Sequence, residues 1–203
     1  MKKSVITLGF VFCALFVLGQ NFKGSLFFGP SFSHVRGDYM TGYNKPGYHM
    51  GFRVAFPFSE KLDVSMAMSY SQKGSRRTYN ADGFGSGSWH LLRTGYIEIP
   101  ITLHTWILNG KVELQGGLAV GRLMHSYWSD IIGSGDLEQD FIRSFEYPFQ
   151  LGAAYAWKEN TYVYFRHSTS IFSVAKGDFS TFLHDYNRGL IHLAAMIGIE
   201  RKF

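Results

Sequence analysis

The chain has few charged residues and few prolines, and it has almost no cysteine. Only 17% of its 203 residues are charged, 5 are proline, and Cys13 is the single cysteine. Because Cys13 lies in an N-terminal segment that we expect to be removed, thiolate metal sites and disulfides are excluded from the mature chain. Aromatic residues (17%) and 23 glycines are abundant instead. That mixture suits β-strands, where aromatic side chains pack well and glycine permits bulges and tight turns.

The first twenty residues are the only segment apolar enough to resemble a membrane-directed helix. Lys2 and Lys3 precede an uncharged apolar run from Val5 to Leu18. This order predicts a signal peptide over residues 1–19, with cleavage after Gly19 or Gln20. The alternative is a single transmembrane anchor, but the run is shorter than the roughly 20 residues that a spanning helix needs.

Removal of the signal peptide also changes the charge balance. The remaining domain, residues 20–203, has 18 basic and 15 acidic residues, a net charge of +3. The isoelectric point of about 9.3 for the whole chain is therefore no argument for nucleic-acid binding.

Period-two alternation recurs along this domain and predicts strands. Between Leu62 and Ser71, large apolar residues alternate with Asp, Ser and Ala. The same pattern, clear or weaker, marks seven other segments, so eight strands are expected. The seven are 23–35, 47–57, 97–104, 112–121, 145–157, 161–171 and 191–200.

Connection lengths carry independent information. The short connections 58–61, 107–111 and 158–160 alternate with the long ones 36–46, 76–93, 128–144 and 172–188. Bacterial outer-membrane barrels have short periplasmic turns and longer external loops. The sequence therefore predicts an all-β fold, an eight-stranded antiparallel up-and-down transmembrane β-barrel of a Gram-negative outer membrane with both termini in the periplasm.

The polar face of the strands decides between a membrane barrel and a soluble one. A soluble ligand-binding barrel, the alternative, would turn its apolar face inward and a charged face to water. Here the polar face is mostly Gly, Ser and Ala, which suits a narrow, side-chain-filled lumen without a general porin channel. Its charges must pair to offset desolvation. The predicted lumen charges are Arg53, Asp63, Glu98, Glu113, Glu146, Arg166 and Glu200.

Two further features bear on the barrel wall. Aromatic residues gather beside the short turns and predict an interfacial girdle. Pro100 and Pro148 lie inside predicted strands, where a residue without an N–H predicts bulges or local loss of ladder bonds. The girdle residues are Phe56, Phe58, Trp106, Trp157, Tyr162 and Phe203.

No constellation of side chains makes a strong case for catalysis, a cofactor or a metal. His167 and Thr169 share a strand face, as the His and Ser of an outer-membrane lipid A deacylase do. Since Thr replaces Ser and the nearest downstream acid, Asp178, lies in a loop, we predict no catalytic residue. The eight histidines are scattered without metal-site spacing, although His104 and His192 could approach inside the barrel.

The loop after residue 76 is Gly-rich and is flanked by cations. The run 83–88 lacks the strand–helix context of a phosphate cradle, so an external loop is expected. Lys73, Arg76, Arg77 and Arg93 surround this loop and are candidates for contact with lipopolysaccharide phosphates or a partner. An ordinary solvated surface is the alternative.

The segments YSQKGS at 70–75 and YIEIPI at 96–101 resemble the most recognisable stretch of the PorT-like outer-membrane β-barrel proteins. The resemblance implies that Pro100 is a family feature. The founding member of that family is an accessory of a protein-secretion and gliding apparatus. The terminal Phe203, after the apolar residues Ala195, Ile197 and Ile199, resembles the insertion signal read by the barrel-assembly machinery, although Arg201 departs from that pattern.

The leading hypothesis is a non-enzymatic integral outer-membrane protein whose loops contact lipopolysaccharide or other envelope components. A secretion accessory, a lipid A-modifying enzyme using His167 and a soluble ligand-binding barrel are the competing hypotheses. Fold alone does not choose among them.

Overall fold

The computed structural model describes residues 22–37, 42–59, 61–76, 91–129, 134–136, 141–176 and 189–203. The predicted signal peptide, Arg77 and the Gly-rich run 83–88 lie outside these residues. No helix within the described ranges is long and apolar enough to cross a membrane.

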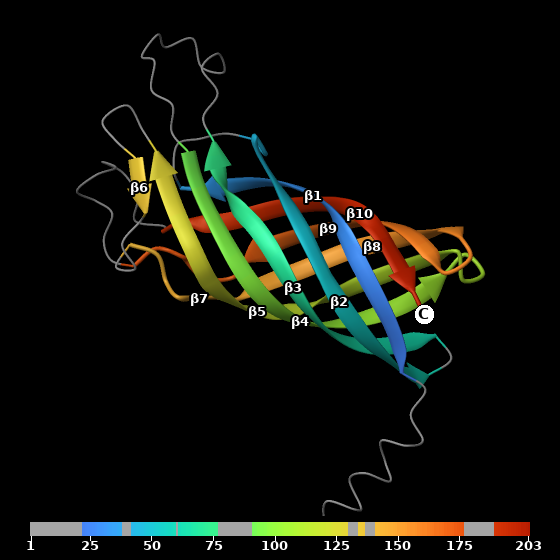
Figure 1. The fold of residues 1–203 in the computed structure, drawn as a ribbon. Helices are drawn as coiled ribbons and strands as arrows, with labels where there is room; N and C mark the ends of the chain where they lie inside the picture. Colours follow the sequence, from blue (N-terminus) through green and yellow to red (C-terminus); the bar gives the residue numbers. More distant parts are fainter. Residues whose placement is uncertain are drawn as a thin grey trace, which may run out of the picture.

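Eight long antiparallel strands form one closed sheet (Figure 1). Each long strand pairs with the next long strand in sequence, including β4 with β5. The first strand, β1, also pairs with the last, β10, and this pairing closes the barrel, which confirms the predicted fold class. The strands are β1 (Lys23–Arg36), β2 (Lys45–Ser59), β3 (Leu62–Arg76), β4 (Leu91–Ile107), β5 (Val112–Ser129), β8 (Pro148–Lys158), β9 (Thr161–Ser170) and β10 (Ile191–Lys202).

Two short strands pair with β5 in the half of that strand that leads into a long connection. β6 (Ser134–Asp136) pairs with the end of β5, and β7 (Phe145–Glu146) pairs with its middle. The sequence predicted β7 and β8 as one strand, and Pro148 at the start of β8 is where the structure divides them.

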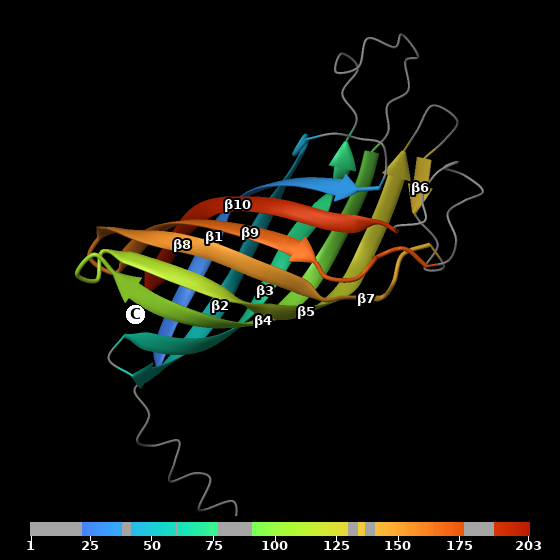
Figure 2. The same cartoon turned by 180° about the vertical axis from the view of Figure 1, so that it is seen from behind.

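The short turns lie at one end of the barrel, and the strand ends that lead into the long connections lie at the other (Figure 2). We call these the short-turn end and the long-loop end. In the turn between β4 and β5, Leu108 and Asn109 have φ values of 51° and 55°. Asn160 has a φ of 55° in the turn between β8 and β9. Asparagine tolerates this left-handed conformation better than most residues, so its short polar side chain suits these tight reversals.

The two faces of the wall differ as the alternation predicts. On β3, Met66 is 58% exposed, whereas its neighbour Ser65 is 2% exposed. On β4, Ile101 and Thr102 show the same contrast. Apolar side chains therefore cover the outside of the barrel, where lipid would bury them, and small polar or charged side chains fill the inside.

The prolines interrupt the ladder without shifting it. The β3–β4 pairing stops after Met66↔Ile101 and resumes at Ser69↔Glu98 in the same register, which leaves a gap beside Pro100. Pro148 lies at the equivalent gap between the β5–β7 and β5–β8 pairings. The predicted local loss of ladder bonds is therefore confirmed, and neither proline requires a bulge.

Candidate functional site: a charged lumen

All seven predicted lumen charges lie buried inside the barrel. The structure divides them, with several partners that the sequence did not indicate, into a cluster at the short-turn end, a central layer and a cluster at the long-loop end.

Arg53 on β2 organises the cluster at the short-turn end. Its Nη1 lies 3.0 and 3.1 Å from the two carboxylate oxygens of Glu200, and 3.7 Å from Glu113. Its Nη2 donates to Gln115 Oε1 at 3.0 Å. Ser25 donates a further hydrogen bond to Glu200 at 2.6 Å. Because these groups are buried, this mutual pairing offsets the desolvation of each charge.

Glu113 connects this cluster to His104 and Lys202. His104 Nδ1 lies 2.5 Å from Glu113 Oε1, and since a carboxylate only accepts, Nδ1 carries the proton. Lys202 Nζ lies 2.5 Å from Glu113 Oε2. His104 Nε2 is within hydrogen-bond distance of the hydroxyls of Ser65 and Thr102, at 2.6 and 2.7 Å. His104 is thus a fully partnered lumen histidine.

Aromatic residues line the mouth of the lumen at this end. Trp106 and Tyr162 meet edge to face, and Lys202 Nζ lies 4.2 and 4.1 Å from their ring centroids. The prediction that these two aromatics belong to an outer girdle was wrong, because they continue the inward phase of His104 and Tyr164. Phe58, Trp157 and Phe203 are strongly exposed on the outside, as a girdle requires. A cavity of about 20 Å³ between Lys23, Asp63 and Glu200 has room for about one water molecule.

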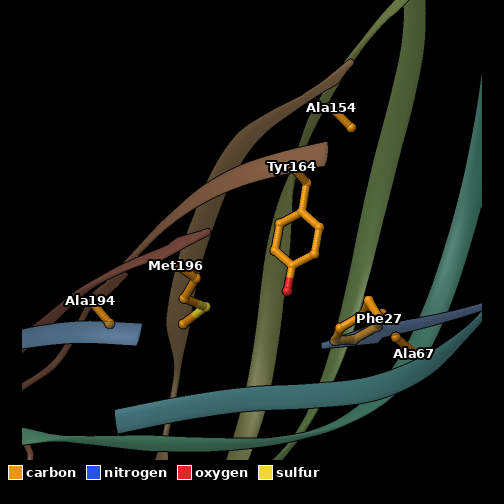
Figure 3. Packing of buried hydrophobic residues seen from close by; sticks show 6 residues of the cluster. All are labelled: Phe27, Ala67, Ala154, Tyr164, Ala194 and Met196. Atoms are coloured by element: carbon orange, nitrogen blue, oxygen red, sulfur yellow. The ribbon is translucent and has the colours of Figure 1, made fainter. Parts of the chain in front are cut away.

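The central layer consists of aromatic and aliphatic side chains between the two charged clusters (Figure 3). The guanidinium carbons of Arg53 and Arg166 lie 5.6 and 5.1 Å from the centroid of Phe27. His49 stacks on Phe27 and bridges Arg166 at 3.3 Å and Tyr164 at 3.1 Å. Because a guanidinium can only donate, His49 Nε2 accepts and Nδ1 donates to the Tyr164 hydroxyl. The other members are Ala67, Ala154, Ala194 and Met196.

Lys73 organises the cluster at the long-loop end. Its Nζ lies 2.6 Å from Glu98 and 3.0 Å from Glu146. Ser170 donates to Glu146, and His192 Nδ1 lies 3.4 Å from the same carboxylate. The prediction that Lys73 is a surface contact for lipopolysaccharide was wrong. β3 extends beyond the predicted strand, and Lys73 continues its inward phase, with 1% of its surface exposed.

An apolar cap lies at the long-loop end beyond this cluster. Val35, Val174, Ala175 and Leu190 are buried together, and Leu92 packs against them. Backbone hydrogen bonds hold the cap: Arg143 N donates to Val174 O at 2.7 Å, and Val174 N donates to Leu190 O at 2.8 Å. Residues 171–176 thus pack across the mouth instead of extending away from it.

His167 and Thr169 share the outward face of β9, and Tyr43 covers them. The Tyr43 hydroxyl lies 2.8 Å from His167 Nε2, and Thr169 Oγ1 lies 3.4 Å from Nδ1. Neither contact includes a carboxylate that could orient the imidazole, so the arrangement lacks the third member of a catalytic triad. Ser170 faces the opposite way and is bound to Glu146.

The remaining predicted sites are dispersed. Arg93 is exposed, Arg76 is half-buried, and Arg77 lies outside the described residues. His104 and His192 belong to the two different clusters. Across the described ranges, no group of three or more His, Cys, Asp or Glu residues has metal-site geometry.

Sequence reasoning missed Lys45, His49 and Lys73, all of which lie inside the barrel. Lys45 and His49 have the same odd-numbered phase on β2 as Arg53, with Gly47 and Gly51 between them. Extending the alternation through those glycines would have placed both side chains in the lumen.

The comparisons with known proteins agree with this architecture. A search of curated proteins found no match. Among solved structures, Ail, the attachment invasion locus protein of Yersinia pestis, aligns with a TM-score of 0.54 and 15% identity, covering 89% of this chain and 98% of Ail. Ail in complex with the heparin analogue sucrose octasulfate aligns at 0.52 and 14%, covering 90% and 99%. These likenesses show the fold.

A family model described as the outer membrane protein beta-barrel domain matches residues 18–176. That span includes seven of the eight barrel strands and both charged clusters except for their β10 residues. The chain therefore belongs to the outer membrane protein beta-barrel domain family and is an integral outer-membrane protein.

Proposed function

We propose that the chain is a non-enzymatic outer-membrane protein with a side-chain-filled lumen, and that its long-loop end contacts other envelope components. The observation that carries this proposal is the content of the lumen. Arg53, Lys73 and Arg166 are each buried against hydrogen-bond acceptors, and aromatic or apolar residues lie at each end of the lumen. A lumen packed in this way leaves no continuous aqueous path, so the outer surfaces carry the function.

The orientation of the barrel follows from the connection lengths. We place the short-turn end in the periplasm with both termini, because short periplasmic turns and long external loops are the rule for such barrels. On this view, residues 1–19 are the signal peptide and Phe203 is read by the barrel-assembly machinery. Phe203 is 72% exposed, and its N–H donates to Gly24 O at 2.9 Å, which holds the terminus against β1.

Lipopolysaccharide is the envelope component whose chemistry fits best at the long-loop end. Arg93 is exposed there and Arg76 is half-buried, and guanidinium groups bind phosphate in two-point contacts. Aromatic side chains accompany them on the outer wall: Tyr48 packs against Tyr70, and Tyr70 stacks on His125. Aromatic rings at this level favour an interface between lipid and water.

Two measurements test the proposal. The folded protein in a planar bilayer should give no stable stepwise conductance, and a lasting open channel would disprove a filled lumen. A photo-crosslinking residue in place of Phe172, exposed at the long-loop end, should capture lipopolysaccharide or a partner in cells. The same residue in place of Leu108, exposed at a short turn, is the control. Equal products from both sites would remove the role of the loops.

A role as an accessory of a secretion apparatus is a second candidate. It rests on the YSQKGS and YIEIPI segments, which lie side by side because Tyr70 pairs with Ile97 and Ser71 with Tyr96. This shared structural unit supports the resemblance to PorT-like proteins, which remains a prediction. Deletion of the gene should then trap exported proteins in the periplasm, whereas normal export would remove this candidate.

A lipid A-modifying enzyme and a soluble ligand-binding barrel have less support. The enzyme would use His167, and mass spectrometry of lipid A should then differ between the wild type and His167→Ala. The soluble barrel conflicts with the apolar outer wall. Its test is electrophoretic mobility in detergent, which boiling should change for a membrane barrel.

A further inference from the structure

Lys45, the first residue of β2, is a buried lysine whose Nζ has no hydrogen-bond partner in the part of the chain that the structure describes. Only 1% of its surface is exposed. Lys73, Arg53 and Arg166, the other buried cations among the described residues, each contact an acceptor. An unpaired charge in a low-dielectric interior carries a large desolvation penalty. The position therefore calls for an anion.

The carboxylates described at this end do not neutralise Lys45. Glu98 and Glu146 both contact Lys73, and Glu146 also accepts from Ser170. Arg93, an exposed residue on the outer face of β4, has the same sign of charge and adds repulsion. Lys45 is therefore a buried cation without a counter-charge among the described residues.

Further hydrogen-bond donors without partners lie on β3 and β4. Ser71 Oγ and Thr94 Oγ1 are buried and have no partner in the described part of the barrel. Thr94 pairs with Lys73 across β3 and β4 and shares its inward phase. An ammonium and two hydroxyls can all donate, and the oxygens of a phosphate group can accept several hydrogen bonds at once.

The ladder between β2 and β3 ends before Lys45. The pairing between β2 and β3 ends at His49↔Ser71, although β2 continues to Lys45 and β3 to Arg76. On its other edge, Lys45 still pairs with Ser33 of β1. Lys45 is therefore held by β1 next to a part of the wall where β2 and β3 are not hydrogen-bonded.

We propose that Lys45, with the buried hydroxyls of Ser71 and Thr94, binds one phosphate-class oxyanion inside the long-loop end of the lumen. The site would exist whether or not the loops recognise a partner. Free phosphate and the phosphate of a lipid headgroup present the same chemistry to it.

The experiment measures binding of inorganic phosphate to the folded full-length mature barrel in zwitterionic detergent, by calorimetry at constant ionic strength. We expect one site per chain in the wild type. Lys45→Met should weaken binding by at least about tenfold, since it removes a charge-assisted contact. Lys111→Met, an exposed lysine in a short turn, should leave binding unchanged. A second arm replaces free phosphate with lipid A that carries or lacks its phosphates.

Each outcome decides the matter. Binding of either phosphate source that Lys45→Met abolishes supports the site and identifies the source. Absence of binding from both arms, or binding that survives in a Lys45→Met barrel of normal heat-dependent mobility, overturns it. If Lys45→Met does not fold, Lys45→Gln and Thr94→Val are tested instead, and unchanged binding in both overturns the proposal. These results are independent of conductance and crosslinking.

Discussion

The two ends of the lumen contain the same kinds of buried charged and polar side chain, but the hydrogen-bond and ion-pair partners of these groups differ between the ends. At the short-turn end, Arg53 contacts two carboxylates and a glutamine, and Glu113 has three partners. Arg53 Nε and Gln115 Nε2 lack a hydrogen-bond partner there among the described groups. At the long-loop end, two carboxylates share the single ammonium of Lys73. The Tyr96 hydroxyl, Ser168 Oγ and His192 Nε2 lack a described hydrogen-bond partner, and His192 Nδ1 has a 3.4 Å contact with Glu146.

This contrast separates a structural role from a binding role. A network in which most charged groups have several partners rigidifies the interior, whereas a larger number of unpartnered buried groups is costly and calls for water or a ligand. The short-turn cluster therefore stabilises the barrel, and the long-loop cluster is the part of the interior whose chemistry is incomplete.

The largest expected effect comes from breaking the short-turn cluster. Arg53→Met leaves Glu200 and Glu113 buried beside one another without their shared cation, which should lower the free energy of unfolding by about 4–5 kcal/mol. Urea unfolding in lipid vesicles, followed by tryptophan fluorescence, measures the loss.

The matched control is Arg201→Met, on the outer wall at the same end. Arg201 bonds to Thr161 and to a backbone carbonyl while exposed, so less than about 1 kcal/mol should be lost. Equal losses in the two variants would show that the buried cluster contributes no special stability. Arg53→Lys, which keeps the charge, provides a measurable variant if Arg53→Met does not fold.

Breaking the long-loop cluster should lower the free energy of unfolding by a smaller amount. Lys73→Met removes the only ammonium between Glu98 and Glu146, but Ser170 and Gln150 still donate to those carboxylates. We expect a loss of about 3 kcal/mol at neutral pH.

Acidification should reduce the difference in free energy of unfolding between Lys73→Met and the wild type. In the variant, protons that bind the unpaired carboxylates remove the buried charge, whereas the wild type gains nothing from protonation because it would give up its ion pairs with Lys73. Unfolding curves at about pH 7 and about pH 5 test the sign. A deficit that stays constant or grows at low pH would mean that the lost cation is not what destabilises the variant.

The apolar cap should have a local effect. Leu190→Ala removes part of the packing with Val35 and Val174, and a loss of about 2 kcal/mol is expected, at the low end for buried leucines because the site lies at the edge of the barrel. Hydrogen exchange should rise in residues 171–176 and leave the short turns unchanged. Leu108→Ala, 70% exposed in a short turn, should change neither quantity. Faster exchange throughout the barrel would show that the cap is part of the global fold.

The strands, their count and their faces could be predicted because one face meets lipid and the other meets a crowded interior. Under that constraint, a shift of one residue would reverse every side chain, so the alternation from Leu62 to Ser71 is unambiguous. Strand ends were less predictable. Lys45 and Lys73 continue an inward phase beyond the predicted limits of β2 and β3.

The pairing inside the lumen could not be read from the sequence. Whether Lys73 meets Glu98 or Arg53 meets Glu200 depends on how the strands are staggered around the closed sheet, which is a property of the whole barrel. The cap was unpredictable for another reason, because residues 171–176 have no alternation. Trp106 and Tyr162 were wrongly predicted to belong to the outer girdle, since aromatic residues near a turn occur both in a girdle and at the mouth of a lumen.

The smallest predicted effect compares the loss of one hydrogen bond in each of the two clusters. Ser25 and Ser170 each donate one hydrogen bond to a buried carboxylate, Glu200 and Glu146 respectively. Glu200 retains two contacts with Arg53 when Ser25 becomes alanine, so Ser25→Ala should cost about 1 kcal/mol. Glu146 retains Lys73, which it shares with Glu98, and a longer 3.4 Å contact with His192, so Ser170→Ala should cost about 1.5 kcal/mol.

Both serine variants remove the same hydroxyl, which makes the difference between them more reliable than either value. Urea unfolding of the pair under one set of conditions measures it. A larger loss from Ser25→Ala than from Ser170→Ala would reverse the assignment, because it would make the short-turn cluster the one that depends on each single donor. Added phosphate should leave the loss from Ser25→Ala unchanged, since the proposed anion site lies at the other end of the lumen.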